Sequence, residues 1–172
     1  MRIRALLPSD KESLLKLLDH SYEEVKKDAN LGECLRLKRP SSGSQDKWFS
    51  EIRKLVNNGD AVVIVAGENG RVVGFCTIIK KDLPESEMSH IGVLGVRVAE
   101  GWRGQGIGTK MMKEALKKSN GKFETIELSV FRTNRNAQRL YERLGFRVWG
   151  MAPKYIKRGR RYFDTVYMSL KI

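Results

Sequence analysis

Residues 103–108 read RGQGIG, so that three glycines alternate with other residues directly behind an arginine. The apolar stretch VLGVRV precedes this turn at 93–98, and the helix-like run TKMMKEALKK follows it at 109–118. A strand, a glycine turn and a helix in this order predict a right-handed crossover, with the helix beginning at the carboxyl end of a parallel strand pair. Ligands bind at that end of α/β sheets, so the turn is the first candidate for a site.

The turn has the chemistry of a phosphate cradle. Its glycines let an oxyanion approach the backbone amides that the first turn of a helix leaves unpaired. The Arg103 guanidinium would add a planar set of donors for phosphate oxygens. The dinucleotide and P-loop motifs do not fit, because no third glycine and no Gly-Lys pair stand where those motifs require them after Gly106 and Gly108. A loop that only lets helix and strand pack closely is the alternative.

Size and charge limit the classes of partner. The 172 residues, 41% of them hydrophobic, suffice for one packed core, and we expect residues 1–172 to form a single domain. The 33 Lys and Arg residues exceed the 20 Asp and Glu residues, and a net charge of +13 suits phosphate-bearing cofactors, nucleic acid or acidic protein surfaces. No apolar run approaches the roughly 18 residues of a membrane span. We therefore expect a cytoplasmic protein with no membrane partner.

The two cysteines indicate neither a disulfide framework nor a metal site. Cys34 and Cys76 lie far apart in the sequence, lack metal-ligand spacing and accompany no secretory signal. We expect reduced, structural thiols and no bound metal.

Periodicity alternates between sheet and helix along the chain. Strands are expected at 2–7, 61–80 (a hairpin turning at GENG), 90–98, 122–131, 146–150 and 160–172. Helices are expected at 8–25, around 48–56, at 109–118 and at 134–146, with a loop at 28–44. In the first helix Ser9 and Glu12 have capping-box spacing, and the predicted inward face is Leu14, Leu18, Tyr22 and Val25.

The stretch from His90 to Phe146 resembles the coenzyme-binding half of the GNAT superfamily of acyltransferases. RGQGIG matches that family's Arg/Gln-x-x-Gly-x-Gly/Ala signature, and NRNAQRLYERLGF at 134–146 matches a second family signature around Tyr141. The tail from Lys154 to Leu170 is similar to the final hairpin of the family, in a subgroup with residues like Asp164 and Met168. Residues 1–60 carry no specific signature.

The resemblance implies an α/β fold, the GNAT fold. It is a mixed sheet of about seven strands flanked by about four helices, with parallel strands 4 and 5 splayed to admit the pantetheine arm. The implied cofactor is acetyl-CoA. Its phosphates would lie on the amides of the turn, and its amide-bearing arm would lie along a strand edge. The expected cofactor contacts are Val96, Arg97, Val98, Arg103, Gly104, Gln105, Gly106, Ile107, Gly108, Thr109, Asn134 and Tyr141. For Asn134, a helix N-cap is the alternative role.

Two residues are the catalytic candidates. By family position Tyr141 would protonate the departing thiolate, although its place on an apolar helical face also suits an ordinary core tyrosine. A base must deprotonate the acceptor amine, and Val93 and Ser129 stand where family members often carry a carboxylate. His90 has a suitable side chain for that role, and the alternatives for a histidine at this position are a cap of the strand and an exposed side chain with no role. Glu127 acting through water, and deprotonation by bulk water, stay open.

The densest positive region lies between Arg132 and Arg161, where ten basic residues accompany one acid, Glu142. Arg135, Arg139 and Arg143 recur every four residues and form one exposed stripe on the predicted helix. The stripe has three possible roles: it is a solvated face, it attracts the anionic cofactor, or it binds nucleic acid. Trp102 and Trp149 are expected to pack against the sheet rather than to stack on a base.

We expect an acetyltransferase that moves an acetyl group from acetyl-CoA to a primary amine by direct attack in a ternary complex. A small amine or an amino acid is favoured as acceptor, while a protein N-terminus or lysine stays open. The alternative is a nucleic-acid-binding module or a non-catalytic CoA sensor on the same fold. Nucleic acid is not the expected partner, and a homodimer is compatible with the sequence.

Overall fold

A computed structural model describes residues 1–28, 40–81 and 87–172. Its helices are η1 (Pro8–Asp10, a 3-10 turn), α1 (Lys11–Lys27), α2 (Ser42–Asn57), α3 (Ile107–Ser119) and α4 (Arg135–Arg143). Its strands are β1 (Arg2–Ala5), β2 (Ala61–Glu68), β3 (Arg71–Lys80), β4 (Ile91–Val98), β5 (Thr125–Phe131), β6 (Arg147–Arg158) and β7 (Arg161–Lys171). The predicted α/β class, seven-stranded sheet and four helices are confirmed.

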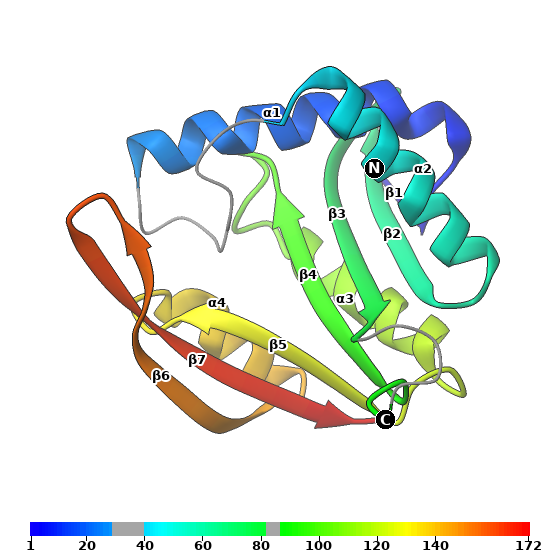
Figure 1. The fold of residues 1–172 in the computed structure, drawn as a ribbon. Coiled ribbons are helices and arrows are strands. Elements are labelled where there is room, and N and C mark those ends of the chain that lie inside the picture. Colours follow the sequence, from blue (N-terminus) through cyan, green and yellow to red (C-terminus); the bar gives the residue numbers. More distant parts are fainter. Residues whose placement is uncertain (29–39, 82–86) are drawn as a thin grey trace.

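The seven strands form one mixed sheet in the order β1-β2-β3-β4-β5-β7-β6. Every neighbouring pair is antiparallel except β4 and β5, which are parallel. These two strands pair over only three positions, from Ile91↔Thr125 to Val93↔Glu127. Beyond that point they diverge into a V that opens toward their carboxyl ends (Figure 1). The predicted splaying of strands 4 and 5 is therefore confirmed.

Two hydrophobic clusters attach helices to the two faces of the sheet. The larger one joins α3 and α4 to β2, β3, β4, β5 and β7 through residues such as Ile64, Met111 and Phe146. The smaller one joins α1 and α2 to β2 and β3 through residues such as Leu14, Phe49 and Phe75. The V thus opens within a layer that has α3 and α4 on one face and α1 and α2 on the other, the layered solution typical of α/β domains.

Local sequence explains most element boundaries. Asn69 and Gly70 both have positive φ, 48° and 74°, which closes the β2–β3 hairpin as predicted. Ser41 caps α2 by accepting a hydrogen bond from the Ser44 amide. The second helix therefore begins at Ser42, inside the segment that the sequence assigned to a loop.

Two expectations for the first helix are wrong. Ser9 and Glu12 form no capping box, because Asp10 occupies the N-cap of α1 and a 3-10 turn precedes it. The buried face is Leu14, Leu17, Ser21 and Glu24 rather than Leu14, Leu18, Tyr22 and Val25. The inward face includes Glu24 because an arginine on a distant segment neutralises that carboxylate, which hydropathy along the helix does not register.

The penultimate strand is longer than expected, since β6 runs to Arg158 instead of ending at Gly150. Two register shifts, between Val148 and Gly150 and between Ala152 and Ile156, interrupt its pairing with β7. The second shift spans Pro153, which cannot donate a ladder hydrogen bond, and both shifts mask the period-two pattern of an edge strand.

Cys76 is a free, fully buried thiol, and burial raises its pKa above the usual range. The expectation for Cys34, and most of the loop predicted at 28–44, fall outside the described residues. No helix in the described parts of the chain is long and apolar enough to cross a membrane.

Candidate active site

The glycine turn stands where the V opens, between the end of β4 and the start of α3. Gly104 and Gly106 have φ of 78° and 75°, a left-handed conformation that residues with a Cβ rarely adopt, and Gly106 is the N-cap of α3. A Cβ built at either glycine would meet no atom within 4 Å. The α3 amides from Ile107 to Thr109 precede the first intrahelical bond, Lys110 N–H to Gly106 O. The turn is thus an open backbone cradle with a positive dipole end.

Arg103 lies at the edge of this cradle and is held in place by two interactions. Its Nε donates to the carbonyl of Val98 at 3.0 Å. Its Nη2 donates to Oε2 of Glu24 on α1 at 2.5 Å, and the Glu24 side chain is only 7% exposed. The guanidinium has further N–H donors beyond these two bonds. Gln105, the next long side chain, turns back to the carbonyl of Gly101 at 2.9 Å and so stabilises the turn itself.

Hydrogen bonds at both ends of β4 show which way its backbone faces. The Ile91 carbonyl accepts from Lys81, and the Ala99 amide donates to Val73 on β3. Because the amide and carbonyl of successive strand residues alternate between the two edges, odd-numbered residues face β3 and even-numbered residues face β5. The backbone of Val96 and Val98 therefore faces the gap of the V, whereas that of Arg97 faces β3. Of the three expected edge residues, two are oriented toward the site.

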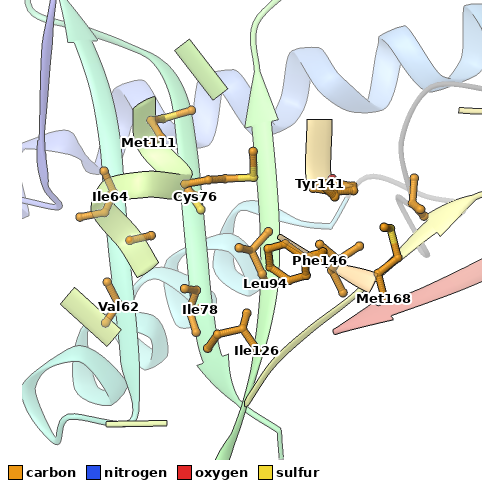
Figure 2. Packing of buried hydrophobic residues seen from close by; sticks show 14 of the residues in the cluster. Val62, Ile64, Cys76, Ile78, Leu94, Met111, Ile126, Tyr141, Phe146 and Met168 are labelled. Atoms are coloured by element: carbon orange, nitrogen blue, oxygen red, sulfur yellow. The ribbon is translucent and has the colours of Figure 1, made fainter. Parts of the chain in front are cut away.

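Tyr141 lies on α4 and is 8% exposed. Its ring meets Phe146 edge-on, with 6.1 Å between the ring centroids. Figure 2 shows Tyr141 on the α4 side of the gap, together with Phe146 and Met168, while Leu94 belongs to β4. The tyrosine is therefore both a member of the large cluster and a neighbour of the diverging strands.

Asn134 is the N-cap of α4, and its Oδ1 accepts from the Ala137 amide at 3.1 Å. The capping role that the sequence left open is present, and this bond leaves the amide nitrogen of Asn134 unused. Its role in cofactor binding stays a prediction.

His90 is exposed and precedes β4 at the closed end of the V, where its carbonyl accepts from Glu124. Six residues of extended chain, about 20 Å, separate it from Val96. The structure therefore does not bring His90 together with the turn and Tyr141, and we do not retain it as a base. The sequence could not exclude it, because both ends of a strand look alike in hydropathy.

The face of the sheet opposite α3 and α4 carries other polar groups. Glu127, at the last paired position of β4 and β5, accepts from Lys81 Nζ at 2.7 Å. Val93 is 41% exposed beside it, and Ser129 follows two residues later on the same face. Glu127 is thus a carboxylate at the branch point of the V, one of the alternatives that the sequence left open.

Three aromatic residues gather next to this face. Tyr167 pairs with Ser129 across β5 and β7, and its ring lies 5.3 Å from Trp149 and 6.1 Å from Tyr155. Trp149 and Tyr155 are 57% and 62% exposed. Trp149 therefore contacts the sheet as predicted but is not buried by it. We call Trp149, Tyr155 and Tyr167 the aromatic cluster.

The arginine stripe is exposed as predicted, with Arg135 bonded to Gln138 and Arg139 bonded to Asn136. Trp102 is partly buried and packs against the large cluster, in agreement with the packing role expected for it.

Residues 16–146 match the Acetyltransferase (GNAT) family. This match covers most of the chain, and the parallel β4–β5 pair with a glycine turn at its open end is the arrangement expected from the resemblance. The protein belongs to the GNAT family.

A curated relative is the L-amino acid N-acetyltransferase AaaT of Escherichia coli (strain K12), 32% identical over 108 residues. The matched segment covers 62% of this chain and 65% of that enzyme, so it spans less than two thirds of the relative.

Solved structures agree in fold. The ribosomal-protein-alanine N-acetyltransferase of Brucella melitensis superposes with a TM-score of 0.83 at 21% identity, covering 100% of both chains. The yncA protein of Salmonella typhimurium, solved with its cofactor acetyl-CoA, gives 0.85 at 19% identity, covering 99% of this chain and 93% of the other.

Sequence reasoning missed Glu24 and the aromatic cluster. Glu24 and Arg103 are separated by 79 positions, so no local pattern connects them. The cluster depends on the bulged path of β6, for which alternation provides no signal.

Proposed function

We propose that the protein is an acetyltransferase that transfers an acetyl group from acetyl-CoA to a primary amine. The observation that carries this proposal is the open glycine turn at the mouth of the V, where φ is positive at Gly104 and Gly106 and no atom lies within 4 Å of an added Cβ. The donor set fits the cofactor, because α3 amides and Arg103 suit a pyrophosphate. Acetyl-CoA supplies an acyl thioester when bound.

Different residues of this chain would bind different parts of acetyl-CoA. Amides from Gln105 to Thr109 and the Arg103 guanidinium would bind the phosphates. The backbone of Val96 and Val98 would align the pantetheine arm, since it faces the unpaired edge of β4. The Val96 amide would also polarise the thioester carbonyl by donating a hydrogen bond to its oxygen.

Tyr141 would donate its phenolic proton, or a hydrogen bond, to the sulfur that leaves. A thiol of pKa about 8.5 departs more readily when a donor meets the developing charge. For the amine, we assign proton removal to Glu127 acting through water, because its carboxylate lies at the branch point on the face opposite α3 and α4. The reaction would proceed by direct attack of the amine on the thioester carbon.

A small amine or an amino acid is the acceptor that we favour. The aromatic cluster borders the polar face and offers ring faces to a substrate's apolar or cationic part. The E. coli relative, named as an L-amino acid N-acetyltransferase, supports this choice, while the Brucella neighbour, named for a ribosomal-protein alanine, keeps a protein N-terminus as the second candidate. A single GNAT domain and a homodimer stay predictions.

The test incubates the purified protein with acetyl-CoA and a panel of acceptors, followed by mass spectrometry of each acceptor. The panel contains free amino acids, small aliphatic amines and peptides with an N-terminal alanine or an internal lysine. We expect an acetylated product in the first two groups. Binding of acetyl-CoA without product from any acceptor would identify a CoA sensor. If the protein neither bound acetyl-CoA nor acetylated an acceptor, the nucleic-acid-binding module would be the favoured alternative.

A further inference from the structure

His20, Glu24 and Glu100 converge from two segments beside the glycine turn. His20 and Glu24 are one helical turn apart on α1. Glu100 lies between the end of β4 and the glycine turn. His20 Nε2 lies 4.0 Å from Glu24 Oε1 and 3.8 Å from Glu100 Oε2, and one donor atom from each residue lies within 4.8 Å of the other two. These separations exceed hydrogen-bond lengths, so the three donors surround a space instead of bonding to one another.

Glu24 provides an independent indication that something belongs in this space. Its side chain is 7% exposed, and its Oε2 is bonded to Arg103. Its Oε1 is buried, and no hydrogen-bond partner for this atom exists among the described residues. A buried carboxylate oxygen without a donor is unfavourable, and this one points toward His20 and Glu100.

We propose that His20, Glu24 and Glu100 form a site for one divalent transition-metal ion, of which Zn²⁺ is the best match. An imidazole nitrogen and two carboxylate oxygens are a ligand set that Zn²⁺ accepts, with water completing the coordination. Bond lengths of about 2.1 Å place tetrahedral ligands about 3.4 Å apart. Contraction to that spacing would move the side chains of His20 and Glu100, which are 58% and 71% exposed.

The charges around the site favour a cation, and solvent can reach the site. Two carboxylates face one neighbouring guanidinium, and Arg103 occupies Oε2 of Glu24 while leaving Oε1 for the ion. A surface hollow of about 560 Å³ is lined in part by His20 and Ala99, and the side chains of His20 and Glu100 are exposed to solvent. The ion would connect α1 to the segment that begins the glycine turn. Sequence spacing predicted no metal because Glu100 lies 80 positions from His20.

The test uses Zn²⁺ alone as probe, so it does not depend on the proposed acetyl transfer. Tag-free full-length protein, stripped with chelator, is titrated with Zn²⁺ by calorimetry and heated with and without the ion. We expect saturable one-to-one binding, a higher melting temperature through linkage, and no comparable binding of Mg²⁺, which prefers all-oxygen octahedra.

Variants locate the ion. His20→Gln and Glu100→Gln should each weaken Zn²⁺ binding by at least about tenfold, and both positions are exposed enough to tolerate the change. His90→Gln removes the only other histidine of the chain and should leave binding unchanged. Absence of saturable binding by the wild type, or equal affinity in all four proteins, would overturn the proposal.

Discussion

The guanidinium of Arg103, in the glycine turn, is bonded to the buried carboxylate of Glu24 on α1, with 2.5 Å between Nη2 and Oε2. This contact attaches the cation of the glycine turn to a helix on the α1–α2 face of the sheet. Arg103 is 40% exposed and Glu24 only 7%, so the pair is partly shielded from water. Removing either partner leaves the other charge in an environment that does not solvate it fully.

Arg103→Gln should therefore lower the free energy of unfolding by about 1–3 kcal/mol, less than for a fully buried pair because Arg103 is partly exposed. The double variant Glu24→Gln/Arg103→Gln should lose less than the sum of the two single variants. Urea denaturation of all four proteins measures the coupling. Additive losses would show that the contact contributes nothing to stability.

Gly106→Val should weaken acetyl-CoA binding by placing a branched side chain where, in the proposed function, phosphate oxygens would approach the α3 amides. Gly70→Val is the matched control, because Gly70 has nearly the same φ, 74° against 75°, and likewise has no atom within 4 Å of an added Cβ. Both variants should lose about 1–2 kcal/mol of stability from left-handed strain. Calorimetry should show a loss of acetyl-CoA affinity only for Gly106→Val. Unchanged affinity in a folded Gly106→Val variant would contradict the hypothesis that the glycine turn binds the phosphates.

Tyr141→Phe keeps the ring that meets Phe146 and removes only the hydroxyl. If the hydroxyl assists the leaving thiolate, turnover should fall by about 10- to 1000-fold with little change in coenzyme affinity. Stability should change by about 1 kcal/mol. Tyr162→Phe, at an exposed position on β7, should retain full turnover. Full activity of the Tyr141 variant would leave that tyrosine as a core residue only.

Asp10→Asn should make the protein less sensitive to acid. Burial tends to raise the pKa of Asp10, but hydrogen bonds from Arg4 and from the Leu7 amide outweigh it and lower the pKa below the usual range. A lowered pKa in the folded state stabilises the protein above the unfolded pKa of about 3.9, and this stability is lost as pH falls through the folded value.

The Asn variant should thus lose about 1–3 kcal/mol near neutral pH and show a flatter dependence of melting temperature on acid pH. Melting temperatures measured across the acid range test this. Asp46→Asn, at a 55% exposed position, should keep the wild-type slope. Parallel curves for the Asp10 variant and the wild type would contradict the expectation.

The arginine stripe is expected to bind no nucleic acid at physiological salt. If Arg135, Arg139 and Arg143 did contact phosphates, affinity would fall steeply with salt, by about 0.9 log unit per log unit of salt for each phosphate. Electrophoretic shift assays with short DNA and RNA at two salt concentrations, for the wild type and a triple Gln variant, decide this. A tight, salt-sensitive shift that the variant abolishes would favour the nucleic-acid module.

Much of the fold could be predicted because its signals are local. The β2–β3 hairpin follows from Asn69 and Gly70, whose positive φ permits the tight turn. The glycine turn and the inward face of α3, with Met111, Met112 and Ala115 buried, follow from spacing within one short segment. The open V follows from the resemblance on those same residues rather than from periodicity.

Other features could not be predicted, since they depend on contacts between distant segments. The inward face of α1 includes Glu24 only because Arg103, 79 positions away, neutralises it. The length of β6 depends on bulges that are set by pairing with β7. His90 resembled a base by chemistry, but its position at the closed end of the V separates it from Tyr141.

The sequence by itself thus determined the class of fold, the family and the backbone cradle, because glycines and short-range periodicity act within a few residues of chain. Only the tertiary structure decided which charges meet: Glu24 with Arg103, and Lys81 with Glu127. The physical reason is that charge pairing depends on distance in space. Such groups meet only where the folded sheet places their segments side by side.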